Sequence, residues 1–195
     1  GVAIGAFVAS GVKMNAELET SFSKWKTLTG SVKGANKQLD FIQKYAKASP
    51  FDFKGVDETA TALVGMGMSI KDTNKWIPTL GDMASVLGGG TEQINGVGIA
   101  LGQMNAKGKV SAEEMMQLSE RGINAWGMLA DGMGLSVAEV QDLSSKGKIL
   151  AKDALPLIYK GMQKAFGGGT AEYMKTTKGQ FENLKESASQ FAGQL

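Results

Sequence analysis

The chain has 195 residues, of which 43% are hydrophobic and 21% are charged, and its formal net charge is +2 at pH 7. It contains no histidine and no cysteine, which excludes Ser-His-Asp triads, Cys/His nucleophile pairs, zinc fingers and disulfides. Arg121 is the only arginine among the 21 basic residues, so specific nucleic-acid binding is not expected.

The sequence predicts an all-α fold. Alternating β-branched runs are absent, whereas helix starts and stops recur throughout the chain. We expect a compact domain of short helices joined by glycine-rich turns, with longer amphipathic helices at both ends. The predicted units are N-terminal helices over 1–48, a helical domain over 49–166 and a C-terminal helix over 167–195.

The first segment predicts a helix over 2–29 that ends at Gly30, because apolar residues recur there at steps of three and four. Its opening run, GVAIGAFVASGV, would extend only about 18 Å as a helix, which is too short to cross a membrane. Ile4, Phe7 and Val8 lie in this run and form a candidate packing or partner surface. The uncapped outer ends of the chain favour an internal piece of a longer helical protein.

A second helix is predicted over 33–48, and the turn after it, over 49–55, is expected to bury Phe51 and Phe53. Later helix starts are assigned from residues that favour N-terminal caps. These candidates are Asp57, Asp72, Thr91, Thr170 and the two capping boxes Ser111/Glu114 and Ser136/Glu139. The last domain helix is predicted over 151–165, with Pro156 tolerated only in its first turn.

A patch of glycines and a pair of similar stretches each predict a feature of the fold. Gly96, Gly98 and Gly102 share the helix that begins near Thr91, and this small-residue patch predicts close packing against a neighbouring helix, a partner or a membrane. The stretches AKGKVSAEEM and SKGKILAKDAL resemble each other, which indicates that the same kind of helix-loop-helix connection occurs twice, and not a regular sequence repeat.

Acidic residues are the only candidates for chemistry, and the acids considered as a hydrolase pair are Glu114 or Glu120 with Asp131. They stand where helix caps and surface charges are expected, so we predict no enzyme, no metal site and no cofactor. Lysines gather over 24–47 and 146–164. A solvated helix face explains them, and weak contact with DNA or an acidic protein wall is the alternative.

An ordered series of motifs resembles the N-terminal domain of phage tail tape measure proteins. The motifs are SPFDFKGVDETATAL (49–63), LGDMASVLGGG (80–90), ALGQMNAKGKVSAEEMMQLSERGINAW (100–126) and GLSVAEVQDLSSKGKI (134–149). The flanking segments KMNAELETSFSKWKTLTG (13–30) and TTKGQFENLK (176–185) also resemble the family. Each motif is weak alone, and their order over about 110 residues makes the resemblance strong.

The resemblance implies a structural role. Such proteins lie in several copies in the lumen of the phage tail, set its length, contact tail-tube and tail-tip proteins, and leave at DNA ejection. They are made in the host cytoplasm, and some help to form a channel through the host envelope. The alternative is therefore a membrane-active helical module in contact with the host membrane; a peptidoglycan-cleaving enzyme is the weaker alternative.

Overall fold

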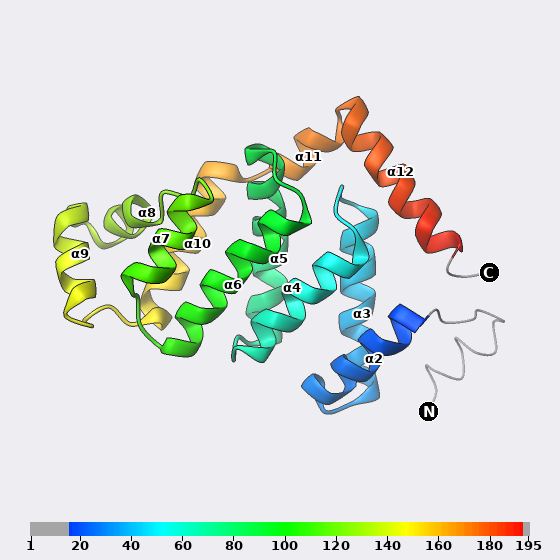
Figure 1. Ribbon diagram of the computed structural model, residues 1–195, viewed down its shortest axis with the longest axis horizontal. Coiled ribbons are helices and arrows are strands. Elements are labelled where there is room, and N and C mark those ends of the chain that lie inside the picture. Colours follow the sequence, from blue (N-terminus) through cyan, green and yellow to red (C-terminus); the bar gives the residue numbers. More distant parts are fainter. Residues whose placement is uncertain (1–15, 193–195) are drawn as a thin grey trace.

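The computed structural model describes residues 16–192, without the side chains of 177 and 187–192 (Figure 1). This part of the chain is helical and contains no strand, which confirms the all-α prediction. The helices are α2 (Ala16–Thr29), α3 (Val32–Lys47), α4 (Phe53–Gly65), α5 (Ile70–Leu87), α6 (Thr91–Lys107), α7 (Ala112–Glu120), α8 (Ala125–Met133), α9 (Val137–Ser145), α10 (Ala151–Phe166), α11 (Gly169–Met174) and α12 (Thr177–Ala192).

The helices form an elongated body with α2 and α3 at one end and α7, α8 and α9 at the other (Figure 1). Helices α4, α5 and α6 lie between these ends, and α4 packs along α6. Helix α10 returns along α8 and α5, α11 continues along α5, and α12 packs on α3. The start of α2 and the end of α12 therefore lie at the same end of the body.

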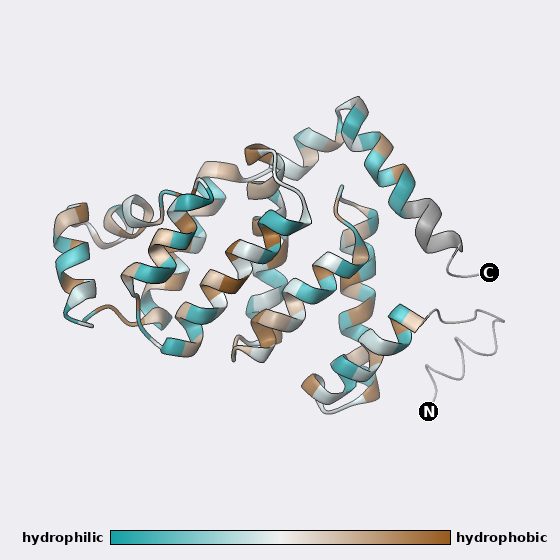
Figure 2. Cartoon of the chain, in the orientation of Figure 1, coloured by the Kyte–Doolittle hydropathy of each residue, from teal (hydrophilic) through white to brown (hydrophobic). Residues whose placement is uncertain are grey.

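One hydrophobic core runs through the body, because each central helix contributes an apolar face to it and carries polar residues elsewhere (Figure 2). Phe51 and Phe53 are 2% and 7% exposed, which confirms that the segment 49–55 buries both rings, although Phe53 is already the first residue of α4. The largest fully buried side chains are Trp25, Ile42, Leu63, Ile77, Leu80, Met83, Ile94, Leu101, Met104, Met115, Leu118 and Ile123.

The two similar loops found in the sequence lie against each other. Lys109 and Leu150 form an isolated antiparallel bridge. The Val110 N–H donates to the Ile149 carbonyl at 2.9 Å, and the Ala151 N–H donates to the Gly108 carbonyl at 3.0 Å. The bridge ties the start of α7 to the start of α10, so segments with similar sequences also have matching places in the fold.

Several predicted caps are wrong by a few residues. Asp52 is the N-cap of α4, because its carboxylate accepts the Gly55 N–H at 2.8 Å, and Asp57 lies inside the helix. Ser69 rather than Asp72 caps α5. The N-cap of α6 is Gly90 rather than Thr91. The Thr91 hydroxyl donates to Asp52 at 2.7 Å instead of capping its own helix.

The two predicted capping boxes have different outcomes. Ser136 and Glu139 form the reciprocal pair of bonds that defines the motif. Ser111 stands at the N-cap of α7, but its hydroxyl donates to the Glu114 carboxylate and makes no bond to the helix backbone. Glu114 is buried and paired with Lys107, and the Ser111 hydroxyl bonds to this carboxylate in place of the backbone.

Two predictions near the end of the chain are also wrong. Pro156 lies in the second turn of α10 rather than the first, and both Pro156 and Lys152 are exposed, so water can satisfy the Lys152 carbonyl that proline cannot reach. Thr170 does not cap the last helix, because α11 ends at Met174 and a new helix begins. The Thr176 hydroxyl caps α12 by accepting the Gly179 N–H at 3.1 Å.

Candidate functional site

The small-residue patch of α6 is covered by other parts of the same chain. A Cβ atom added at Gly98 would lie 2.7 Å from the Thr59 methyl of α4, and one added at Gly102 would lie 2.2 Å from the Met66 Cε at the end of α4. At Gly96 the nearest atom would be the Arg121 Cζ at 2.1 Å. These glycines let α4 and Arg121 approach α6 closely. Ile4, Phe7 and Val8 lie outside the described residues.

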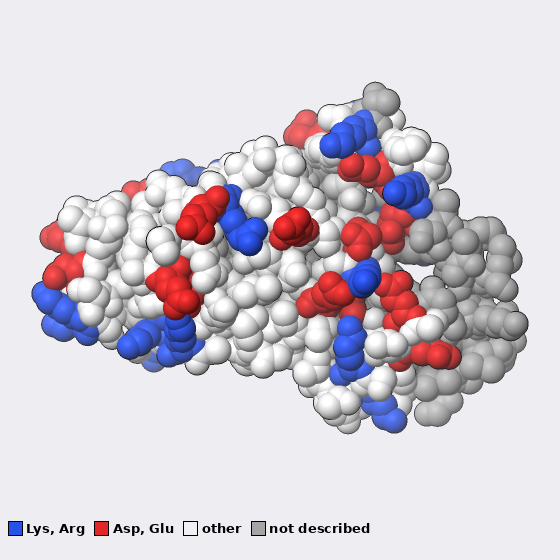
Figure 3. Space-filling view, viewed as in Figure 1, with Lys and Arg blue, Asp and Glu red and all other residues white. Residues whose placement is uncertain are grey.

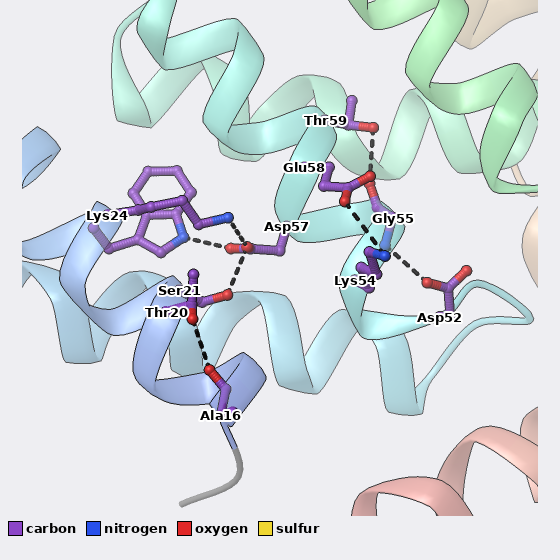
Figure 4. A network of polar contacts seen from close by, with 11 residues as sticks. Ala16, Thr20, Ser21, Lys24, Asp52, Lys54, Gly55, Asp57, Glu58 and Thr59 are labelled. Carbon is purple, nitrogen blue, oxygen red and sulfur yellow. Dashed lines mark hydrogen bonds and ion pairs between the residues drawn. The ribbon is translucent and has the colours of Figure 1, made fainter.

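Helix α2 is bound to α4 through a buried carboxylate, Asp57 on α4 (Figure 4). Asp57 is 2% exposed and accepts hydrogen bonds from Ser21 Oγ at 2.7 Å and Trp25 Nε1 at 2.6 Å. Lys24 Nζ adds a charged bond at 2.9 Å, and its side chain is 37% exposed. One acid therefore satisfies three donors on a single face of α2.

Ser21, Lys24 and Trp25 of α2 form a joint with Asp57 of α4. The sequence contains a signal for this joint that the assignment of helix caps missed. Ser21, Lys24 and Trp25 stand at positions i, i+3 and i+4 of a helix and so share one face. A buried Trp ring requires a partner for its N–H, which predicts an acceptor on the facing helix. Asp57 supplies it, but its position near a helix start favoured the interpretation as a cap.

The acids considered for hydrolysis lie in different surroundings. Glu114 is fully buried on α7, where it accepts from Lys107 Nζ and Ser111 Oγ. Glu120 and Asp131 are exposed on α7 and α8. Residues 16–192 contain no cluster of three metal-ligating side chains.

The pKa of Glu114 is set by opposing effects. Burial alone would raise its pKa, but hydrogen bonds from Lys107 and Ser111 outweigh burial and lower the pKa below the ordinary value of 4.5. A general acid needs the opposite shift. Glu114 is therefore a structural ion-pair partner that ties the end of α6 to the start of α7.

The lowered pKa predicts an acid-sensitive contribution to stability. The Glu114 contribution is fully present above the ordinary pKa of 4.5 and is lost as the pH falls through the lower folded-state pKa. Glu114→Gln is expected to cost about 1–2 kcal/mol at neutral pH and progressively less as the pH falls below 4.5, measured by urea unfolding. Glu113 also contacts Lys107 but is 66% exposed, so Glu113→Gln should cost less than about 0.5 kcal/mol. An equal cost of both variants at neutral pH would contradict this assignment.

Polar side chains of α12 bind to the segment that connects α3 to α4. Asn183 Nδ2 donates to the carbonyls of Lys47 at 2.5 Å and Ser49 at 3.3 Å, where α3 ends. The Glu186 carboxylate accepts the Phe53 N–H at 3.2 Å, where α4 begins. An amide donor at a helix C-terminus and a carboxylate at a helix N-terminus match the unpaired groups and the dipoles of both ends.

A groove with a volume of about 440 Å³ lies between α5 and α10. Trp76 and Tyr159 line it and meet edge to face, with ring centroids 5.1 Å apart. Lys75 lies over the Tyr159 ring, 5.2 Å from its centroid, and Lys152 and Lys160 also line the groove. The groove is therefore lined by two aromatic rings, three lysines and one acid, Asp72.

Charges of both signs are interspersed along the rest of the visible surface (Figure 3). In residues 16–192 no helix is both long and apolar enough to cross a membrane. The apolar run over 1–12 lies outside the described residues, so the membrane-active alternative stays a prediction.

Comparison with known proteins places these helices in a family. The tape measure protein family matches residues 9–195. The chain is 26% identical over 157 residues to a probable tape measure protein of Escherichia phage Mu, covering 80% of this chain and 23% of that protein. It is 27% identical over 168 residues to the tape measure protein of Lactococcus phage F4-1, covering 83% of this chain and 46% of that protein.

A third relative, a probable tape measure protein of Salmonella phage Felix O1, is 32% identical over 113 residues, or 56% of this chain and 15% of that protein. The chain thus spans less than half of the length of each of these relatives. No solved structure matches the fold. Because the family match extends over nearly the whole sequence, the chain belongs to the tape measure protein family.

Proposed function

We propose that the chain is part of a structural tail protein that sets the length of a phage tail, lies in the tail lumen and leaves at DNA ejection. The family match over residues 9–195 is the observation that carries this proposal. The buried acids support a structural rather than catalytic role, because Asp57 and Glu114 are both engaged by donors from neighbouring helices.

Within that protein, the described segment serves as a folded docking domain and not as the ruler. As one continuous helix, residues 16–192 would extend about 265 Å at about 1.5 Å per residue. Instead the chain turns back repeatedly, so that α10 lies beside α5 and α12 beside α3. We propose that this body contacts further copies of itself and proteins of the tail tube and tail tip, and that an extended helical tract elsewhere in the protein measures length.

The test compares two changes of equal size in the full-length protein within its phage. A deletion in an extended helical tract outside this chain should shorten the tail by about 1.5 Å per residue, measured by electron microscopy. An insertion of the same number of residues at the exposed turn after α8, at Gly134, should leave tail length unchanged because this turn joins two short helices of a folded body. Tails of unchanged length after the deletion would overturn the ruler function.

A further inference from the structure

The groove between α5 and α10 carries positive charge that the chain itself does not neutralise. Its lysines are Lys75, Lys152 and Lys160, and all three are exposed. Within the described part of the chain, none of their amino groups forms an ion pair. Asp72, the acid in the lining, accepts a bond from the Ser69 hydroxyl at 2.6 Å beside the N-terminus of α5. Three lysines against one acid leave the groove with a surplus of positive charge.

A backbone acceptor without its usual donor lies beside the same groove. Pro156 has no N–H, so the Lys152 carbonyl lacks the donor that position i+4 would supply inside α10. Both residues line the groove and are exposed. A peptide can donate a backbone N–H to this carbonyl, whereas the phosphate backbone of a nucleic acid has no donor to offer. The acceptor therefore favours a peptide as the ligand.

The aromatic rings of the groove also fit a peptide better than a nucleic acid. Single strands are held by bases that stack on open aromatic faces. Trp76 is 5% exposed, and the Lys75 amino group already lies over the Tyr159 ring, 5.2 Å from its centroid. Leu155 also lines the groove and is 7% exposed. This mostly buried apolar lining suits contact with the tip of an aliphatic side chain.

The spacing of two lysines along α10 specifies the spacing of the acids that would pair with them. Lys152 and Lys160 are eight residues apart, or about 12 Å along a helix at about 1.5 Å per residue. Pro156 lies midway between them and lines the groove with both. An extended peptide covers about 13 Å in four residues. Acids at positions i and i+4 of an extended peptide match the two lysines.

From the unpaired lysines, the free carbonyl and this spacing, we propose that the groove binds an extended acidic segment of a partner protein. Two acids four residues apart pair with Lys152 and Lys160, and the residue midway between them donates its N–H to the Lys152 carbonyl. Complementary charge orients the segment along α10. The inference rests on the proposed docking role, and it names a surface and the chemistry of the segment that the surface receives.

Fluorescence anisotropy with the 195-residue chain tests the charge pairing. The probe is a labelled nine-residue peptide with glutamate at its third and seventh positions, leucine at its fifth and serine elsewhere. It should bind at least about tenfold more tightly than the same peptide with glutamine in place of both glutamates, and Lys160→Glu should remove this difference. Equal binding of the two peptides to the unmodified chain would overturn the proposal.

Lys164→Glu is the matched control for the charge reversal. Lys164 is also an exposed lysine of α10, one turn after Lys160, but it does not line the groove. Lys164→Glu changes the net charge by the same amount and should change the affinity for the acidic peptide less than about threefold, because surface charges far from a ligand are screened. Equal losses in the two variants would overturn the assignment to the groove.

The free carbonyl is tested with Pro156→Ala. Alanine supplies an N–H to the Lys152 carbonyl within α10, so the acidic peptide should bind about threefold to tenfold more weakly. The same peptide methylated on the leucine nitrogen lacks the donor and should bind equally weakly to both chains. An unchanged affinity of Pro156→Ala, or tighter binding of a single-stranded oligonucleotide with the same label, would overturn the proposal. These measurements use the chain alone, so they can fail or succeed independently of the tail-length test.

Discussion

Replacing Asp57 with alanine is expected to lower the free energy of unfolding by about 2–4 kcal/mol. The substitution leaves Ser21 Oγ and Trp25 Nε1 buried between α2 and α4 without their acceptor. Lys24 adds less to the cost, because its side chain is 37% exposed and can turn toward water. Urea unfolding followed by circular dichroism measures the change.

Two further substitutions separate the contributions at this joint. Asp57→Asn keeps an acceptor of similar shape but loses the charge and one acceptor oxygen. Its free energy of unfolding should therefore lie between that of the unmodified chain and that of Asp57→Ala. Asp40→Ala removes an acid that is 61% exposed and paired with Lys44 on α3, and it should cost less than about 0.5 kcal/mol. If Asp57→Ala cost no more than Asp40→Ala, the joint would not hold α2.

The joint also determines where the structure opens first. Helix α2 contacts only α3 and α4 extensively, whereas α5 and α6 contribute many of the buried core residues. Loss of Asp57 should therefore raise amide exchange in α2 more than in α6, because the lost contacts are local to α2. Equal acceleration in both helices would show that the joint acts on the whole body instead.

The sequence predicted helices well wherever the apolar period was strong. Local signals were enough to predict α3, and Gly88 ends α5 with φ 75°, as the three glycines after Leu87 indicated. Cap positions were less predictable, because the side chain of a residue that favours a cap can instead bond to another side chain. Thr91 and Ser111 each favour a helix start by type, but one hydroxyl bonds to Asp52 and the other to Glu114.

Partners across the fold were harder to predict than elements. The glycines of α6 indicated a close approach, but the sequence does not say whether α4, another protein or a membrane approaches. The apolar stripe of α12 has the same limit, since the spacing of Phe181 and Leu184 is identical for a buried and an exposed stripe. Only the polar contacts of Asn183 and Glu186 show which side of α12 is already occupied.

Gly98 on α6 packs closely against Thr59 on α4, and Gly98→Leu is expected to lower the free energy of unfolding by about 3 kcal/mol. The Thr59 methyl that a Cβ would strike belongs to a fully buried side chain, and the Thr59 hydroxyl donates to the Gly55 carbonyl at 2.9 Å. The methyl can turn away only by breaking that bond. Helices α4 and α6 must therefore separate to admit a larger side chain.

An alanine series along α6 distinguishes close packing from helix propensity. Alanine favours a helix over glycine by about 1 kcal/mol at each position, so packing decides the differences. At Gly96 and Gly102 the added Cβ meets the flexible ends of Arg121 and Met66, both of which are only half-buried and can shift. Gly96→Ala and Gly102→Ala should therefore change stability by less than about 1 kcal/mol, whereas Gly98→Ala should destabilise by about 1–2 kcal/mol. Thermal and urea unfolding of the three variants would contradict the assignment if Gly98→Ala were the most stable, since α4 would then have room to spare at Thr59.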